Sequence, residues 1–144
     1  MTARLLLAIV LVGGALRADL PQAKVESNLG KRAMLALDNA FNELTQARDA
    51  YERGQNEQVT IFTKKIQESV ELAETSLHET GKNPRKNPKW FKRAESSTRD
   101  LLRRLDSFQQ SMDVSDRPML DAVKAKVLQV HDDLLEGVLE GKEK

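Results

Sequence analysis

The chain has 144 residues, 40% of them hydrophobic, which is enough for one domain with a hydrophobic core. It has no cysteine, which excludes disulfides and cysteine-ligated metals. Lys and Arg number 23 and Asp and Glu 22, so the formal net charge of +1 gives no indication of nucleic-acid binding.

The first 18 residues predict a secretory signal peptide. Arg4 supplies a positive start, and an unbroken run of apolar residues and glycine extends from Leu5 to Leu16. This run is shorter than the roughly 20 apolar residues of a membrane-spanning helix. We therefore expect cleavage after Ala18, which leaves residues 19–144 as one domain in the periplasm or outside the cell. Retention of the segment as an N-terminal anchor is the alternative.

Four predicted helices follow, each marked by an apolar stripe at steps of three and four residues. The first spans about residues 20–53, with Asp19 as its expected cap and Gly54 as its expected stop. Gly30, inside this helix, is either a tolerated surface glycine or the site of a close approach between helices. The stripe consists of Val25, Leu29, Ala33, Leu37, Ala40, Leu44, Ala47 and Tyr51.

The second predicted helix spans about residues 56–80 and ends at Gly81. The third spans about residues 88–112 and begins after Asn87, with Pro88 in its first turn. The second stripe consists of Val59, Phe62, Ile66, Val70, Ala73 and Leu77. The third consists of Phe91, Ala94, Thr98, Leu101, Leu105, Phe108 and Met112.

The fourth predicted helix spans about residues 116–140, with Pro118 in its first turn. Gly137 lies near its end and has the same two interpretations as Gly30. The stripe consists of Met119 or Leu120, Val123, Val127, Val130, Leu134 and Val138. Short connections between successive helices favour antiparallel neighbours. The predicted fold is all-α: an antiparallel up-down-up-down four-helix bundle after an N-terminal signal peptide.

One segment is distinguished by its charge. Residues 82–93, KNPRKNPKWFKR, carry six cations and no acid, and we call this segment the basic turn. Without residues 1–18 and the basic turn, the chain has 15 basic and 22 acidic residues, so its positive charge is segregated. Free N–H groups at the start of the third helix add to the attraction for anions. The candidate binding residues are Lys82, Arg85, Lys86, Lys89, Trp90, Lys92 and Arg93.

This pattern predicts contact with an anionic component of the cell envelope or with an acidic protein. Peripheral contact with a membrane surface is one form of this interaction. The alternative is a solvated basic loop beside two apolar side chains, since charge runs are common on exposed surfaces.

The stretch GKNPRKNPKWFKRAESSTRDLLRRL, from Gly81 to Leu105, resembles a segment of an uncharacterised family of small secreted bacterial proteins that are predicted to be helical bundles. The resemblance covers mainly the second helical hairpin. It implies export and a helical bundle, and it carries over no activity or site residue.

Exported helical bundles also include the b562-type cytochromes, which ligate haem with a methionine of the first helix and a histidine of the fourth. Met34 and His131 lie on the corresponding predicted helices, although both are deeper in the bundle than in that family. A haem-binding electron carrier is therefore an alternative, with Met34 and His131 as the cofactor ligands. Otherwise we expect no cofactor and no metal site, because neither His78 nor His131 shares its helix face with enough ligands.

A further alternative is an exported chaperone of the Spy type, a family that is also small, helical and free of cysteine. The LTxxQ motif of that family is missing, because Leu44, Thr45 and Gln46 lack its spacing. Catalysis has no support, since no nucleophile is paired with a base and no glycine-rich phosphate loop is present. We expect a non-enzymatic binding or scaffold protein.

The expected oligomeric state is a monomer or a homodimer. Leucines at the edges of the predicted core leave room for a second apolar face. These leucines are Leu35, Leu102, Leu128, Leu135 and Leu139.

Overall fold

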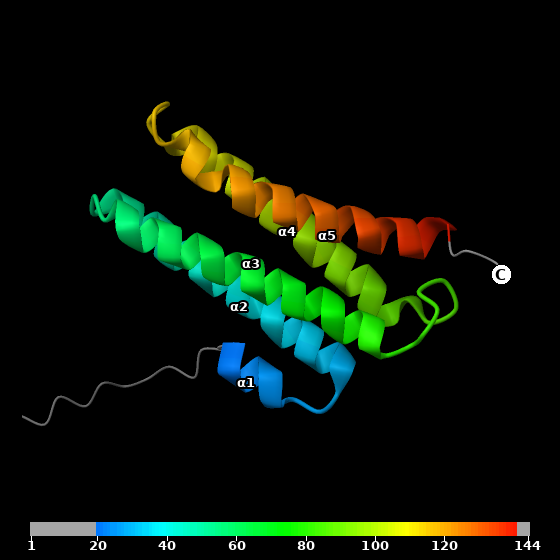
Figure 1. Cartoon of the computed structure of the whole chain (residues 1–144). Coiled ribbons are helices and arrows are strands. Elements are labelled where there is room, and N and C mark those ends of the chain that lie inside the picture. The colour runs from blue at the N-terminus through cyan, green and yellow to red at the C-terminus, as the bar shows by residue number, and fades with distance from the viewer. Residues whose placement is uncertain (1–19, 141–144) are drawn as a thin grey trace, which may run out of the picture.

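The computed structural model describes residues 20–140, so the predicted signal peptide and the expected cap Asp19 lie outside the described residues. All regular structure within residues 20–140 is helical (Figure 1). The elements are α1 (Leu20–Val25), α2 (Leu29–Glu52), α3 (Asn56–Glu79), α4 (Pro88–Ser111), the 3-10 helix η1 (Arg117–Leu120) and α5 (Asp121–Glu140). The predicted all-α class is confirmed for this part of the chain. None of the described helices combines the length and the hydropathy that a membrane span requires.

The first predicted helix, residues 20–53, is wrong as one continuous element. The chain leaves the helix after Val25, α2 begins at Leu29, and Figure 1 shows α1 folded back along α2. Local side-chain bonds favour the break, since Asn28 Oδ1 accepts the backbone N–H of Lys31 at 3.0 Å and caps α2. Val25, predicted to lie in the core, is 81% exposed. Ala23 is fully buried and gives α1 its apolar contact.

The fourth predicted helix begins differently from the expectation of residues 116–140. A 3-10 turn, η1, precedes α5, which starts at Asp121. Pro118 lies in η1, where its missing N–H and fixed φ suit a tight first turn. Asp116, the residue before η1, makes no side-chain capping bond.

The core is built largely from the predicted stripes. All seven residues of the third stripe are buried, as predicted from their spacing; six lie in α4 and Met112 directly follows it. α2 buries a wider face than its stripe, because it contacts α1, α3 and α4. The additional buried positions on α2 are Gly30, Ala36, Asn39 and Ala50. Most are small, so the neighbouring helices can approach α2 closely.

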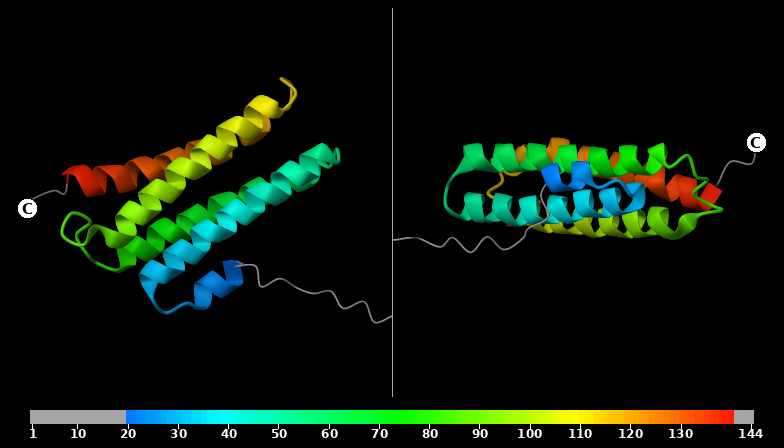
Figure 2. Two further views of the ribbon diagram at one scale, coloured as in Figure 1. Left: turned by 180° about the vertical axis from the view of Figure 1, so that it is seen from behind. Right: turned by 90° about the horizontal axis from the view of Figure 1, so that it is seen from below.

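The four long helices form two antiparallel hairpins, α2–α3 and α4–α5 (Figure 1). Between the hairpins α2 packs beside α4 and α3 beside α5, and each of these pairs runs in one direction (Figures 1 and 2). The antiparallel prediction therefore applies within the hairpins and not between them. α3 and α4, consecutive in sequence, make little contact with each other. The basic turn that joins them thus crosses the end of the assembly diagonally. The hairpins diverge toward the opposite end, which we call the tip end (Figures 1 and 2).

Candidate functional site

The basic turn is ordered by its own polar residues. Gly81 ends α3 at φ 63°, a left-handed conformation that glycine adopts without strain. The Thr80 hydroxyl then accepts the backbone N–H of Lys82 at 3.2 Å. Asn83 Oδ1 accepts the N–H groups of Arg85 at 2.9 Å and Lys86 at 3.4 Å, which makes an Asx turn.

Two apolar side chains hold the basic turn against glycines on other helices. A Cβ atom on Gly30 of α2 would lie 2.4 Å from the Trp90 indole, so the ring occupies the space that any side chain would need. A Cβ atom on Gly137 of α5 would lie 3.2 Å from Pro84 Cγ. Gly30 is therefore a site of close approach between helices, whereas Gly137 is approached by the basic turn and not by a helix. The turn is attached to α2 at one side and to α5 at the other.

The cations of the basic turn remain accessible. All six are exposed, and none takes part in the ion pairs found within residues 20–140. Lys89 Nζ lies 4.8 Å and Arg93 Cζ 5.5 Å from the Trp90 ring, so two cations stack on the indole. The cap Asn87 makes no side-chain bond to the first turn of α4. The helix N-terminus therefore adds N–H groups to the positive surface.

Trp90 has a structural position within this site. Its ring is partly buried and packs against the core. Asp38, on the neighbouring α2, interacts electrostatically with Arg93 of the basic turn. Burial raises the pKa of the Asp38 carboxyl, and the Arg93 guanidinium partly offsets this increase. The exposed charge of the basic turn is therefore carried by its Lys and Arg side chains. The Trp90 indole holds the backbone of this segment against the core.

Met34 lies on α2 and His131 on α5. These two helices do not pack extensively against each other. His131 Nε2 lies 3.0 Å from Glu95 Oε1, and Nδ1 lies 3.2 Å from Asp132 Oδ1. Both ring nitrogens thus have carboxylate partners, and no described contact joins His131 to Met34. Among the described residues, no group of three or more His, Asp or Glu side chains is arranged to hold a metal ion.

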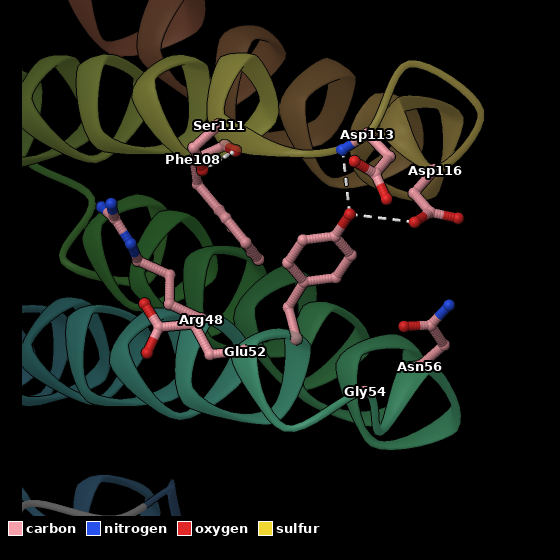
Figure 3. Close-up of a pocket in the computed structure, with 9 residues that line it drawn as sticks. Arg48, Glu52, Gly54, Asn56, Phe108, Ser111, Asp113 and Asp116 are labelled. Carbon is pink, nitrogen blue, oxygen red and sulfur yellow. Dashed lines mark hydrogen bonds between the residues drawn. The ribbon is translucent and has the colours of Figure 1, made fainter.

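A polar pocket of about 550 Å³ lies at the tip end, between the α2–α3 and α4–α5 hairpins (Figure 3). The Tyr51 hydroxyl donates to Asp116 Oδ2 and accepts the backbone N–H of Asp113, both at 2.9 Å. Its ring meets Phe108 edge to face, with centroids 5.9 Å apart. The lining residues are Arg48, Tyr51, Glu52, Gly54, Asn56, Phe108, Ser111, Asp113 and Asp116.

Two more pockets follow the seam between α2 and α4. One of about 430 Å³ is lined by Asp38, Phe41, Asn42, Ser96, Ser97, Asp100 and Arg104. The next, of about 370 Å³, is lined by Arg48, Asp100, Arg103, Arg104 and Ser107. Shared residues connect the pockets in a series: Arg104 belongs to both, and Arg48 also lines the tip pocket. Sequence reasoning missed this groove because the pairing of α2 with α4 leaves no local pattern.

Comparison with protein-family models, curated proteins and solved structures finds no match to this chain. The resemblance of residues 81–105 to small secreted bundle proteins therefore stays a prediction. The geometry of the sites is the basis on which a function can be proposed.

Proposed function

We propose that this chain is an exported, non-enzymatic helical-bundle protein that binds an anionic partner of the cell envelope through the basic turn. The observation that carries the proposal is the combination of anchoring and charge in residues 82–93. Six exposed cations, which form no ion pair with any residue of 20–140, lie on a segment held by Trp90 and Pro84. Export is inferred from the apolar run in residues 1–18.

The anchoring supports recognition because it fixes the cations before a partner arrives. A segment that is already ordered loses less conformational entropy on binding than a flexible loop. The Asx turn at Asn83 and the two glycine contacts supply this order. The four long helices would then act as a rigid support for one charged end.

The mode of binding that this arrangement favours is electrostatic. Trp90 packs against Gly30, so the turn does not offer this indole for insertion into a lipid layer. Each Lys or Arg near an anionic membrane surface contributes about 1 kcal/mol, and the attraction falls off within a Debye length. Binding should therefore weaken steeply as the salt concentration rises.

The test is co-sedimentation of the protein, purified after export, with vesicles of phosphatidylcholine alone or mixed with phosphatidylglycerol. We expect binding to the anionic vesicles only, at low salt, and its loss at high salt. The double variant Lys86→Glu with Lys89→Glu should not bind. The intact mass of the purified protein reports whether residues 1–18 have been removed.

A matched control carries the same change of net charge away from the basic turn. Lys64→Glu with Arg53→Glu alters two exposed cations of the α2–α3 hairpin, and this variant should bind as the wild type does. The proposal is wrong if the Lys86 and Lys89 variant still binds, or if both double variants lose binding equally.

A further inference from the structure

Two arginines on the seam between α2 and α4 stack on aromatic rings of the opposite helix. Arg104 of α4 has its Cζ 5.0 Å from the centroid of Phe41 on α2. Arg48 of α2 has its Cζ 5.6 Å from the centroid of Phe108 on α4. Figure 3 shows Arg48 reaching from α2 toward α4. Stacking restricts where a guanidinium group can lie and leaves its N–H edge free to donate hydrogen bonds.

Neither of these arginines is neutralised within the described part of the chain. The ion pairs found there include Arg103 with Asp100, but they include neither Arg48 nor Arg104. Asp100, the carboxylate that lines the pocket of about 370 Å³, is therefore already paired with Arg103. Within residues 20–140, Arg48 and Arg104 are thus two oriented charges that form no ion pair.

The pocket of about 370 Å³ lies between them, and both line it together with Ser107. Three arginines and one aspartate give this lining a net positive charge. Its size falls within the range of about 300–1,000 Å³ that is typical of small-molecule sites. The adjoining pocket adds the hydroxyl groups of Ser96 and Ser97, against which the polar remainder of a larger ligand would lie.

We propose that this pocket is a binding site for a phosphate group, held by the guanidinium groups of Arg48 and Arg104 and by the Ser107 hydroxyl. Guanidinium N–H groups in a planar fork match the oxygens of phosphate, and such charge-assisted bonds are among the strong ones in proteins. The ligand class is a small phosphate monoester or the phosphate of a lipid headgroup. Because Arg48 and Arg104 belong to different hairpins, a bound phosphate links α2 to α4.

The site is separate from the basic turn and shares no residue with segment 82–93. The experiment is NMR of the ¹⁵N-labelled protein at constant ionic strength, titrated in turn with inorganic phosphate, glycerol 3-phosphate and phosphatidylglycerol vesicles. The probes are the Nε–H signals of Arg48 and Arg104 and the amide of Ser107. With at least one of the three phosphates, we expect these signals to shift and saturate; sodium chloride should leave them unchanged.

Substitutions locate the effect and separate it from the proposed function. Arg48→Gln and Arg104→Gln should each weaken the interaction at least about tenfold, because each removes charge-assisted bonds. Arg53→Gln, an exposed control on the same hairpin as Arg48, should not. Lys86→Glu with Lys89→Glu should retain the seam response to inorganic phosphate and glycerol 3-phosphate, because neither residue lines the seam pocket.

Saturation with a soluble phosphate supports a free phosphate ester as the ligand, and saturation with vesicles alone supports a lipid headgroup. The proposal is overturned if the wild-type seam signals do not saturate with any of the three, or if only signals of residues 82–93 respond. The wild-type titration does not depend on whether the arginine variants fold, and helix content by circular dichroism checks them.

Discussion

The indole of Trp90 lies directly on the backbone of Gly30, where a Cβ atom would come within 2.4 Å of the ring. This contact joins the first turns of α4 and α2, which are far apart in sequence. It explains a glycine inside a helix, a position that usually costs up to about 1 kcal/mol relative to alanine. Glycine is required at this position despite its low helix propensity, because any Cβ atom would overlap the Trp90 ring.

Gly30→Ala should therefore have opposite effects in two backgrounds. With Trp90 present, overpacking costs about 1–3 kcal/mol, which exceeds the gain in helix propensity, so the free energy of unfolding falls. With Trp90→Ala, the same substitution should raise the free energy of unfolding by about 0.5–1 kcal/mol. Chemical denaturation followed by circular dichroism measures both effects. An effect of the same sign in both backgrounds would show that the ring does not require glycine.

Tyr51, the one tyrosine in the chain, should titrate above its ordinary pKa of 10.0. The hydrogen bond from the Asp113 N–H is the largest single influence and lowers this pKa, but burial and the carboxylates of Asp116 and Asp113 together raise it. Asp116→Asn removes one negative charge, so the pKa should fall. Ultraviolet absorbance of tyrosinate against pH measures it directly. Asp38→Asn, near the middle of α2 and outside the tip pocket, is the control and should leave the pKa of Tyr51 unchanged.

Asn39 and Ser69 form a buried polar pair between α2 and α3. Asn39 Nδ2 donates to Ser69 Oγ at 2.8 Å, and the Ser69 hydroxyl donates to the carbonyl of Lys65 at 2.9 Å. Ser69→Ala should lower the free energy of unfolding by about 1–3 kcal/mol, because it leaves the Asn39 amide buried without this acceptor. The double variant with Asn39→Ala should lose less than the two single losses together. Denaturation of all four proteins measures the coupling, and strict additivity would contradict a direct interaction.

Glu43 should limit stability at neutral pH. Its Oε2 is buried without a hydrogen-bond partner, and burial raises its pKa above 4.5 despite the opposing attraction of Lys65. A raised carboxyl pKa means that the folded state holds the proton more tightly. Its contribution to stability is therefore present below pH 4.5 and lost as the pH rises through the folded-state pKa.

Glu43→Gln should accordingly raise the melting temperature at pH 7, and the gain should shrink toward pH 4. Thermal unfolding at several pH values checks this. Glu57→Gln is the control: this exposed residue lies in the first turn of α3, where its negative charge is favourable, so its loss should not stabilise the protein. A melting temperature of Glu43→Gln equal to or below that of the wild type at pH 7 would contradict the prediction.

Most of the local structure follows from patterns within single segments of the sequence. The sequence predicted the second helix as about 56–80 and the third as about 88–112, and the structure has Asn56–Glu79 and Pro88–Ser111. Gly54 and Gly81 have φ values of 72° and 63°, as expected of glycines that follow helix ends. These features depend on residues a few positions apart. Periodicity and backbone preferences within one segment are enough to specify them.

Tertiary structure alone decided how these elements meet. Three features join residues from separate segments. They are the parallel pairing of α2 with α4, the Trp90 ring on Gly30, and the arginines stacked across the seam. A stripe at helical spacing shows that a face is buried, but it does not show against which helix. The choice among partners depends on how side chains of different helices fill the same space, and no local pattern records that.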